Sequence, residues 1–279
     1  MIFPGGVSGR LRALGLTPKK SLGQHFLVSD GALRRILEAT NLRPGDLVLE
    51  IGPGLGILTE AILQQGARIV AVELDRELAS ALTIRFAEQT ANVRIVHGDA
   101  RRLDPVDLLD PHESYQVVAN LPYYAAASII RKFLESSHRP TRLVVMLQRE
   151  VAQSMIGAPG RFSLLAIGIH YFGKPRLVAS VPPGAFYPPP KVTSAIVCID
   201  VAPETPLPAE DYQRFFSLVK AGFSAPRKQI RGALSQGLNA PPRDIETLLS
   251  SGGIDQRRRP ATLSLQEWLT LYSLAKNRL

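Results

Sequence analysis

The stretch Leu47-Val-Leu-Glu-Ile-Gly-Pro-Gly-Leu-Gly56 decides the fold class of this 279-residue chain. A mainly apolar run leads into glycines at positions 52, 54 and 56, and a helical pattern follows over Ile57–Gln64. This order is typical of nucleotide-binding α/β domains, in which the glycines let a ligand approach the backbone. A dinucleotide fingerprint would have its third glycine at position 57, where this chain has isoleucine. The turn therefore predicts a nucleoside site, or a purely structural turn, and disfavours an NAD-dependent dehydrogenase.

Short β-branched runs alternate with helical patterns up to about residue 200, which favours βαβ units and a mainly parallel sheet. The predicted strands are Leu47–Ile51, Arg68–Glu73, Val93–His97, Gln116–Ala119 and Leu143–Leu147, and two later runs, Pro175–Val181 and Ala195–Val201, are expected to form a hairpin-like edge pair. The predicted helices between the strands are Ile57–Gln64, Arg76–Glu88, Ser128–Glu135 and Glu150–Met155.

A proline-rich stretch separates this pattern from the rest of the chain. Residues 202–209 contain three prolines, which oppose both a helix and a central strand and predict a linker. Helical patterns follow over Asp211–Ala221, Lys228–Gln236, Pro242–Ser250 and Ser264–Lys276. We therefore expect a larger domain over residues 1–203, with a basic extension over about residues 1–29, and a small helical domain over residues 204–279.

The charge balance points to a polyanionic partner. The chain has 33 Lys and Arg against 24 Asp and Glu, a net charge of +9, and a pI near 9.9. Such a balance favours nucleic acid over a membrane, with a merely basic surface as the alternative. Because the chain has a single cysteine, Cys198, an internal disulfide and a cysteine-cluster zinc site are excluded, and the apolar run around Cys198 predicts a buried structural thiol. No metal site is expected.

The chain shows no signal for a membrane or for export. No apolar stretch approaches the roughly 20 residues that span a bilayer. Arg10 and Arg12 interrupt the N-terminal segment where a signal peptide would need an apolar core. The expected location is the cytoplasm.

Two acidic residues end the strands that follow the glycine turn. Glu73 ends the second predicted strand, twenty-one residues after Gly52, where α/β domains place a carboxylate on the ribose hydroxyls. Asp99 follows the third strand, where a carboxylate can accept a hydrogen bond from an adenine amine. A glycine turn, a Glu and an Asp at three consecutive strand ends predict a nucleoside ligand beyond the carboxyl ends of the sheet.

The fourth predicted strand leads into Asn120-Leu121-Pro122-Tyr123, which we interpret as the catalytic centre. An adenine N6 amine is a poor nucleophile because its lone pair is delocalised into the ring. Two acceptors, the Asn120 side-chain oxygen and the carbonyl of Leu121 or Pro122, would hold its hydrogens and direct the lone pair at a methyl group. Tyr123 would stack on the base. The alternative is a simple Asn-x-Pro turn.

Three further segments carry a family resemblance. Lys19-Lys-Ser-Leu-Gly-Gln-His-Phe-Leu27 resembles a K-S-L-G-Q-N-F-L segment, Val181–Val192 resembles a P-x-x-F-x-P-x-P-x-V loop, and Arg227-Lys-Gln-Ile-Arg231 resembles an R-K-x-x-R helix start. Together with the glycine turn and the quartet, they make the chain similar to the KsgA/RsmA family of ribosomal RNA adenine dimethyltransferases. The resemblance implies a Rossmann-like class I methyltransferase sheet, mostly parallel with an antiparallel edge strand, and a small C-terminal all-helical domain.

The resemblance also implies an activity. The expected reaction is S-adenosyl-L-methionine-dependent dimethylation of N6 on two adjacent adenosines in the 3′-terminal hairpin of 16S ribosomal RNA. The first domain would bind S-adenosylmethionine and the helical domain would bind RNA, and the enzyme would act as a monomer on an immature 30S subunit during ribosome biogenesis.

The resemblance assigns the site residues. The residues expected to line the cofactor pocket are Gln24, His25, Leu27, Gly52, Gly54, Glu73, Leu74, Asp99, Ala100 and Asn120. Phe186 would face Tyr123 across the target adenine, with core packing as the alternative for this side chain. The chain departs from the family at His25, which replaces the usual Asn, and at Ala126-Ala-Ser128, which replaces Ser-Thr-Pro and predicts a packing change. The first departure places an imidazole in place of an amide at an expected cofactor contact.

Basic residues in both domains are expected to contact RNA phosphates, which set affinity and orientation without selecting the base. These residues are Arg10, Arg12, Lys19, Lys20, Arg227, Lys228 and Arg231.

Two alternative functions stay open at this point. The first is an erythromycin-resistance-type methyltransferase of 23S ribosomal RNA, although those enzymes more often carry Ile where Leu121 stands. The second is a non-catalytic ribosome-assembly or transcription factor with the same fold, which the intact quartet disfavours.

Overall fold

The computed structural model describes residues 6–276, and the chain divides into two compact units. The first unit comprises Met1–Ala152 and Lys174–Val201, and the second comprises Gln153–Gly173 and Ala202–Leu279. The sequence predicted that residues 153–173 belong to the first domain, whereas in the structure they belong to the second unit. These residues belong with the C-terminal helices because Tyr171 stacks on Phe215, with ring centroids 5.4 Å apart.

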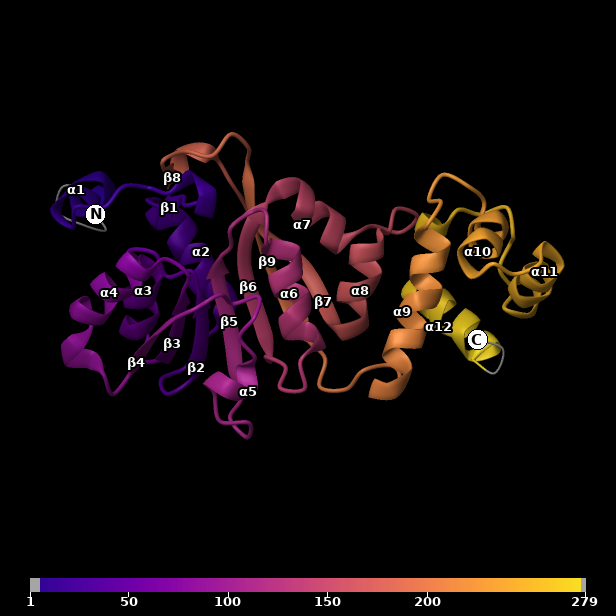
Figure 1. Ribbon diagram of the computed structural model, residues 1–279, viewed down its shortest axis with the longest axis horizontal. Helices are drawn as coiled ribbons and strands as arrows, with labels where there is room; N and C mark the ends of the chain where they lie inside the picture. The colour runs from indigo at the N-terminus through magenta and orange to yellow at the C-terminus, as the bar shows by residue number, and fades with distance from the viewer. Residues whose placement is uncertain (1–5, 277–279) are drawn as a thin grey trace. The chain divides into compact units, whose positions relative to one another are not determined.

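A seven-stranded sheet forms the centre of the first unit within the described residues (Figure 1). Its strands are β2 (Leu47–Ile51), β3 (Arg68–Glu73), β4 (Val93–His97), β5 (Tyr115–Asn120), β6 (Arg142–Gln148), β7 (Gly173–Val181) and β9 (Ser194–Val201). The strand order is β4-β3-β2-β5-β6-β9-β7, and the pairs from β4 to β6 are parallel. This arrangement confirms the predicted sheet, and β2, β3 and β4 have the predicted bounds.

The antiparallel strand lies one position in from the edge. β9 pairs with β6 in antiparallel register, with Val144 opposite Cys198, and β7 forms the edge beyond β9. The two late runs are therefore neighbours, as expected, although the antiparallel strand itself is not the edge strand.

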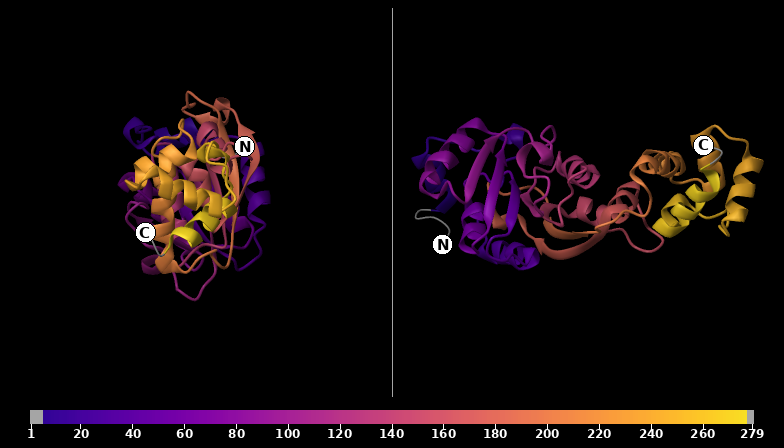
Figure 2. Two further views of the ribbon diagram at one scale, coloured as in Figure 1. Left: turned by 90° about the vertical axis from the view of Figure 1, so that its right-hand side faces the viewer. Right: turned by 90° about the horizontal axis from the view of Figure 1, so that it is seen from below.

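Near-continuous apolar runs form these strands because both faces of the sheet are covered. All five residues of β2 are buried, including Glu50. Helices lie on both faces (Figure 2), and α2 and α3 pack on one face through Ile36 and Ile62, against Val48 and Val118. A strand that is buried on both sides loses the alternation of a half-exposed strand.

The helices of the first unit connect its strands. They are α1 (Gly6–Ala13), α2 (Asp30–Thr40), α3 (Ile57–Gln64), α4 (Arg76–Arg85), α5 (Pro105–Leu108), α6 (Ala126–Glu135) and α7 (Arg149–Ile156), the last of which contains the boundary between the units. The sequence did not predict α1, whose Val7 and Leu11 pack against Phe26 and Leu55. Ser29 caps α2 and Asp75 caps α4, each by accepting from a backbone N–H of the first turn.

A second, two-stranded sheet lies beyond the carboxyl ends of the parallel strands (Figure 1). It pairs β1 (Phe26–Leu27) with β8 (Phe186–Tyr187), with Phe26 opposite Tyr187 and Leu27 opposite Phe186. The sequence did not predict this pairing, because two residues are too few to show a period. It joins the N-terminal segment to the proline-rich loop, two parts of the chain that both carry expected site residues.

The second unit is helical, as expected for the C-terminal part of the chain. Its helices are α8 (Leu164–Phe172), α9 (Ala209–Phe223), α10 (Ile230–Leu238), α11 (Pro242–Ser251) and α12 (Leu265–Ala275). Trp268 of α12 is fully buried, and Gly222 of α9 leaves room for its ring. A Cβ at position 222 would clash with the indole. Within residues 6–276, no helix is both long and apolar enough to cross a membrane.

Candidate active site

The glycine turn between β2 and α3 adopts a backbone conformation that favours glycine. Gly52, Gly54 and Gly56 all have positive φ, and Gly54 has a φ of 59°. A Cβ at position 54 would lie 3.1 Å from the Phe26 ring, which covers the turn from the N-terminal segment. Positive φ and close approach together explain why glycine is required here.

Glu73 at the end of β3 is buried, with 6% of its surface exposed. Its Oε2 accepts from the Gly54 N–H over 3.0 Å and its Oε1 accepts from the Asp75 N–H over 2.9 Å. A carboxylate has about four lone-pair sites, so two remain for a ligand. Burial raises the pKa of Glu73, while these two hydrogen bonds lower it.

Asp99 after β4 is saturated with hydrogen bonds from one arginine. Oδ1 accepts from the Arg101 backbone N–H at 2.9 Å and from Nε at 3.0 Å, and Oδ2 accepts from Nε at 3.1 Å and Nη2 at 2.6 Å. The Arg101 side chain accordingly holds the pKa of Asp99 below its usual range. All four lone-pair sites are therefore engaged, so the expected contact with an adenine amine requires the guanidinium to move. The same guanidinium lies over the Tyr124 ring, 5.8 Å from its centroid.

The Asn120 side chain at the end of β5 is held in one orientation. Its Nδ2 donates to the carbonyl oxygen of His25 over 2.9 Å, and a carbonyl can only accept, so Oδ1 stays available. The Leu121 carbonyl has no hydrogen-bond partner among the described residues, whereas the Pro122 carbonyl accepts from the Ala125 N–H over 3.0 Å. Of the two carbonyls that the sequence left open, the structure favours Leu121 as the second acceptor.

Tyr123 is fixed at both its hydroxyl and its ring. The hydroxyl shares a 2.6 Å hydrogen bond with the Ser194 hydroxyl, and burial raises the Tyr123 pKa. The ring stacks on the His25 imidazole, with centroids 5.9 Å apart and planes inclined by 24°. The phenol therefore stays protonated and has a fixed plane.

Phe186 is buried in the core and makes no ring contact with Tyr123 among the described residues. The side chain is 4% exposed and belongs to the core cluster that also contains Leu27, Val181 and Ala185. It is absent from the residues that line the pocket among those described. Core packing, the alternative reading of this residue, matches its position because β8 pairs with β1 and directs the ring inward.

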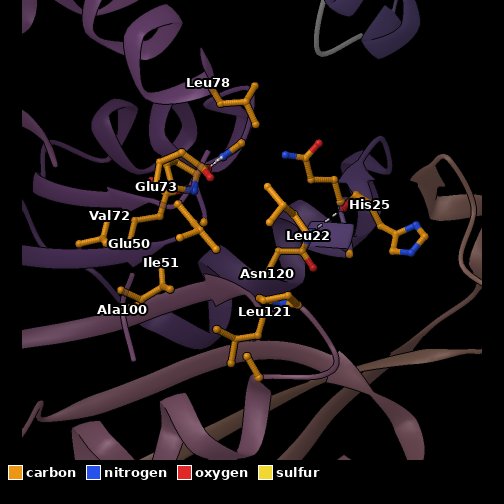
Figure 3. A pocket seen from close by; sticks show the side chains of 18 of the residues that line it. Leu22, His25, Glu50, Ile51, Val72, Glu73, Leu78, Ala100, Asn120 and Leu121 are labelled. Atoms are coloured by element: carbon orange, nitrogen blue, oxygen red, sulfur yellow. Dashed lines mark hydrogen bonds between the residues drawn. The ribbon is translucent and has the colours of Figure 1, made fainter. Parts of the chain in front are cut away.

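The remaining predicted residues converge on one pocket (Figure 3). All ten expected cofactor residues and the whole quartet line it: Gln24, His25, Leu27, Gly52, Gly54, Glu73, Leu74, Asp99, Ala100, Asn120, Leu121, Pro122 and Tyr123. Gln24 is held by two further contacts, because its Oε1 accepts from the Lys19 N–H at 2.7 Å and its Nε2 donates to Asp75 at 2.8 Å.

Glu50 and Arg101 also line the pocket, although the sequence interpretation did not select them. Glu50 is fully buried in β2, and Thr59 donates to its Oε2 over 2.7 Å, while Oε1 has no partner among residues 6–276. Burial raises the Glu50 pKa to about 8. A charged residue inside the apolar run of the first strand was the signal for Glu50, since an acid seldom occurs in a strand buried on both faces.

The basic residues expected to contact RNA fall into two groups. Arg12, Lys20 and Arg227 are exposed and form no ion pair with the described residues. Lys19 instead pairs with Asp75 at 2.9 Å and with Glu77 at 2.6 Å, Arg231 pairs with Glu246, and Lys228 donates to Gln236. Arg10 lies on α1 and lines a small hollow with Arg85. Ion pairing neutralises part of the charge of Lys19 and Arg231, so Arg12, Lys20 and Arg227 are better placed to hold phosphates, whereas Lys228 keeps its charge because its partner is a neutral amide.

The fold and the pocket together define a class of protein. A mainly parallel seven-stranded sheet with one antiparallel strand, and a pocket of glycines and strand-end acids at its carboxyl edge, is the class I methyltransferase architecture. The chain belongs to the ribosomal RNA adenine dimethylase family, whose model matches residues 15–277. The resemblance in the sequence is thereby confirmed, as is the expected enzyme class.

Curated relatives match over most of their length. A protein named ribosomal RNA small subunit methyltransferase A from Dehalococcoides mccartyi is 43% identical over 256 residues, which cover 92% of this chain and 88% of the relative. Its namesake from Moorella thermoacetica is 38% identical, covering 96% of each chain.

Solved structures agree with the fold. The 23S rRNA methyltransferase ErmE has a TM-score of 0.72 at 27% identity, covering 90% of this chain and 99% of that one. A dimethyladenosine transferase from Plasmodium falciparum has a TM-score of 0.79 at 24% identity, covering 91% and 98%, and supports the fold alone.

Proposed function

We propose that the chain transfers methyl groups from S-adenosylmethionine to N6 of two adjacent adenosines in the 3′-terminal hairpin of 16S ribosomal RNA. It would do so in the cytoplasm, as a monomer, on an immature 30S subunit. The observation that carries the proposal is the pair of free acceptors, Asn120 Oδ1 and the Leu121 carbonyl, on residues that line the pocket.

These acceptors suit an exocyclic amine. An N6 amine has two hydrogens in the plane of its ring, and two fixed acceptors can take one each, which directs the nitrogen lone pair out of that plane. The Asn120 oxygen is pre-oriented because its Nδ2 is anchored on His25. Both acceptors also stabilise the positive charge that develops on the nitrogen. For the second methylation the amine rotates and presents its remaining hydrogen to the same acceptors.

The pocket fits the proposed cofactor on the opposite side. Glu73 keeps two lone-pair sites for ribose hydroxyls, and the Gly52–Gly54 turn allows a close approach to the backbone. The unpartnered Oε1 of Glu50 is a further buried polar group on the lining. When bound, S-adenosylmethionine supplies an electrophilic methyl group on a sulfonium centre.

The amine product needs no strong base. A methylated ammonium on an aromatic ring is acidic enough to lose its proton to water. Tyr123 is unsuited to take that proton, because its hydroxyl is bound to Ser194 and its pKa is raised. The role we assign to Tyr123 is to stack on the base, which must leave its RNA stack to reach the site.

The relatives favour a small-subunit substrate over the erythromycin-resistance alternative. Relatives named for the small subunit are 36–44% identical over about nine-tenths of the chain, compared with 27% for the 23S rRNA methyltransferase. Leu121 also agrees with the small-subunit enzymes. The non-catalytic alternative is disfavoured because both acceptors are free and oriented.

Mass spectrometry of the RNA product tests the proposal. Purified protein is incubated with S-adenosylmethionine and 30S particles from a strain that lacks this modification, in parallel with protein-free 23S RNA. We expect two dimethyladenosines in one 16S fragment and unmodified 23S RNA. Methylation of 23S RNA alone would support the erythromycin-resistance type, and no methylation of either RNA would support the non-catalytic factor.

A further inference from the structure

His25 is an expected cofactor residue, but its side chain is bound to the proline-rich loop on the other side of the pocket. Its imidazole Nδ1 lies 2.7 Å from the carbonyl oxygen of Pro188, in the proline-rich loop. In Figure 3 the ring points away from the Glu73 side, and Asn120 lies between the two residues. Because a carbonyl only accepts, Nδ1 carries the hydrogen of this bond.

The same imidazole is the aromatic neighbour of Tyr123. The two rings are stacked, with centroids 5.9 Å apart and planes 24° apart, and no other described ring stacks on Tyr123. The partner expected from the family, Phe186, is buried in the core instead. The aromatic contact that orients Tyr123 thus comes from the N-terminal segment.

The main chain of His25 makes a third contact, since its carbonyl accepts from Asn120 Nδ2. His25 therefore contacts three parts of the chain: the catalytic Asn120 through its backbone, and Tyr123 and the Pro188 loop through its ring. Any side chain at position 25 keeps the first contact. Only a planar ring with a donor at the right place keeps the other two.

We propose that the His25 side chain is a positioning residue for the target base and does not hold the cofactor. It fixes the plane of the Tyr123 ring by stacking and fixes the proline-rich loop by its hydrogen bond to Pro188. The target base would then pack against an aromatic surface that is already in place. The proposal rests on the function proposed above. It assigns to the base side a position that the resemblance assigns to the cofactor side.

Three substitutions separate the contacts. His25→Ala removes the stack and the hydrogen bond, His25→Phe keeps a ring without the donor, and His25→Asn keeps a donor without a ring. All three substitutions keep the backbone carbonyl of residue 25, which accepts the hydrogen bond from Asn120 Nδ2. His112→Ala, at an exposed histidine outside the pocket, is the matched control.

Two binding measurements need no turnover. Calorimetry with S-adenosylhomocysteine reports the cofactor side, and fluorescence of a 16S hairpin with 2-aminopurine at the target adenosine reports stacking on the base side. Steady-state methylation then gives kcat and KM for 30S particles. Thermal unfolding of each variant verifies that it is folded.

We expect His25→Ala to raise KM for 30S particles and the Kd for the hairpin about 5- to 10-fold, as for the loss of one aromatic pair. Its Kd for S-adenosylhomocysteine should stay within about twofold of wild type, and kcat should change less than KM. His25→Phe should recover most of the RNA affinity, because the ring remains. His25→Asn should resemble the alanine variant, because the amide cannot stack.

A cofactor Kd raised tenfold in folded His25→Ala, with RNA binding unchanged, would overturn the assignment and return the side chain to the cofactor. RNA parameters equal to wild type in all three variants would overturn it as well. Wild-type protein that neither methylates 30S particles nor quenches the 2-aminopurine signal overturns the proposed function and this assignment with it. A methylating wild type with an unaffected alanine variant overturns only the role of His25.

Discussion

The two sides of the pocket are built in different ways. The side proposed for the cofactor consists of the ends of adjacent parallel strands, where the glycine turn, Glu73 and Asp99 follow β2, β3 and β4. The side proposed for the target base combines one strand end, Asn120, with short segments around His25 and Pro188, which flank the two-residue strands β1 and β8. Strand register positions the first side, and individual side-chain contacts position the second.

This difference also appears in the polar groups of each side. On the cofactor side, carboxylates are buried or paired before any ligand arrives, as with Glu73 on two backbone N–H groups. On the base side, the Asn120 and Leu121 oxygens are free acceptors held in place by neighbouring contacts. Substitutions on each side should therefore separate the binding of the cofactor from the handling of the base.

Asn120→Ala is expected to give the largest difference between the effect on methyl transfer and the effect on cofactor binding. Removing the oriented acceptor should lower kcat about 1000-fold, as for the loss of one group that stabilises a transition state. The Kd for S-adenosylhomocysteine should rise no more than about threefold, since Glu73 and the glycine turn are untouched. Single-turnover methylation and calorimetry measure the two quantities.

Asn120→Asp serves as the control for this prediction. It keeps an acceptor but places a second oxygen against the His25 carbonyl, so its orientation is lost and it should also be slow. A fast alanine variant would contradict the assigned role of the side chain.

The sequence placed the glycine turn, Glu73 and Asp99 together at one end of the sheet, where they line the pocket, and the reason is physical. Three strands have the predicted bounds, and parallel strands bring their carboxyl ends to one edge, so Glu73 and Asp99 had to meet near the glycine turn. The saturation of Asp99 by Arg101 was not predictable, because it depends on a rotamer of an exposed side chain.

The base side was predicted less well. Its quartet follows a strand and lines the pocket, as the sequence predicted. Phe186 and His25 lie in segments too short to show the hydrophobic periodicity of a strand or helix. The pairing of β1 with β8 decides that Phe186 turns inward. A family motif identifies the residue but not the face on which its side chain lies.

Phe186 gives the second largest expected effect. As a core side chain, Phe186→Ala should destabilise the protein by about 3 kcal/mol, whereas Phe186→Leu should cost less than about 1.5 kcal/mol. The leucine variant should keep KM for 30S particles within about twofold. Chemical denaturation and steady-state kinetics test both statements.

The opposite result for Phe186→Leu would restore the resemblance-based role. If the ring stacks on the target base during the reaction, the leucine variant will be nearly as stable as wild type but will raise KM for RNA about 10-fold. That outcome would mean that the loop rearranges when RNA binds.

Glu50, which lines the pocket from β2, is expected to make the stability of the protein depend on pH. Its folded pKa of about 8 lies above its usual value of 4.5, so between these pH values the folded chain keeps a proton that the unfolded chain releases. The contribution of Glu50 to the free energy of unfolding is therefore fully present below about pH 4.5. It falls by about 1.4 kcal/mol per pH unit as the pH rises toward 8.

Glu50→Gln should remove that slope. Between pH 6 and pH 8, wild type should lose roughly 2 kcal/mol of unfolding free energy relative to the glutamine variant, measured by urea denaturation at each pH. Glu88→Gln, at an exposed glutamate, controls for the loss of one acid. Parallel curves for wild type and Glu50→Gln would show that the buried carboxyl is already ionised at pH 6.

The smallest expected effect concerns the one cofactor-side group that is not ready for its ligand. Arg101 fills every lone-pair site of Asp99, so its guanidinium competes with an incoming adenine amine. Because the pair is partly exposed, its strength is modest, and Arg101→Ala should tighten S-adenosylhomocysteine binding only about threefold. Arg102→Ala removes an equal charge next in the chain without a side-chain bond to Asp99, and should leave the Kd nearly unchanged. Weaker binding by Arg101→Ala would instead mean that the guanidinium itself contacts the cofactor, and that the cofactor side, like the base side, depends on individual side-chain contacts as well as on strand register.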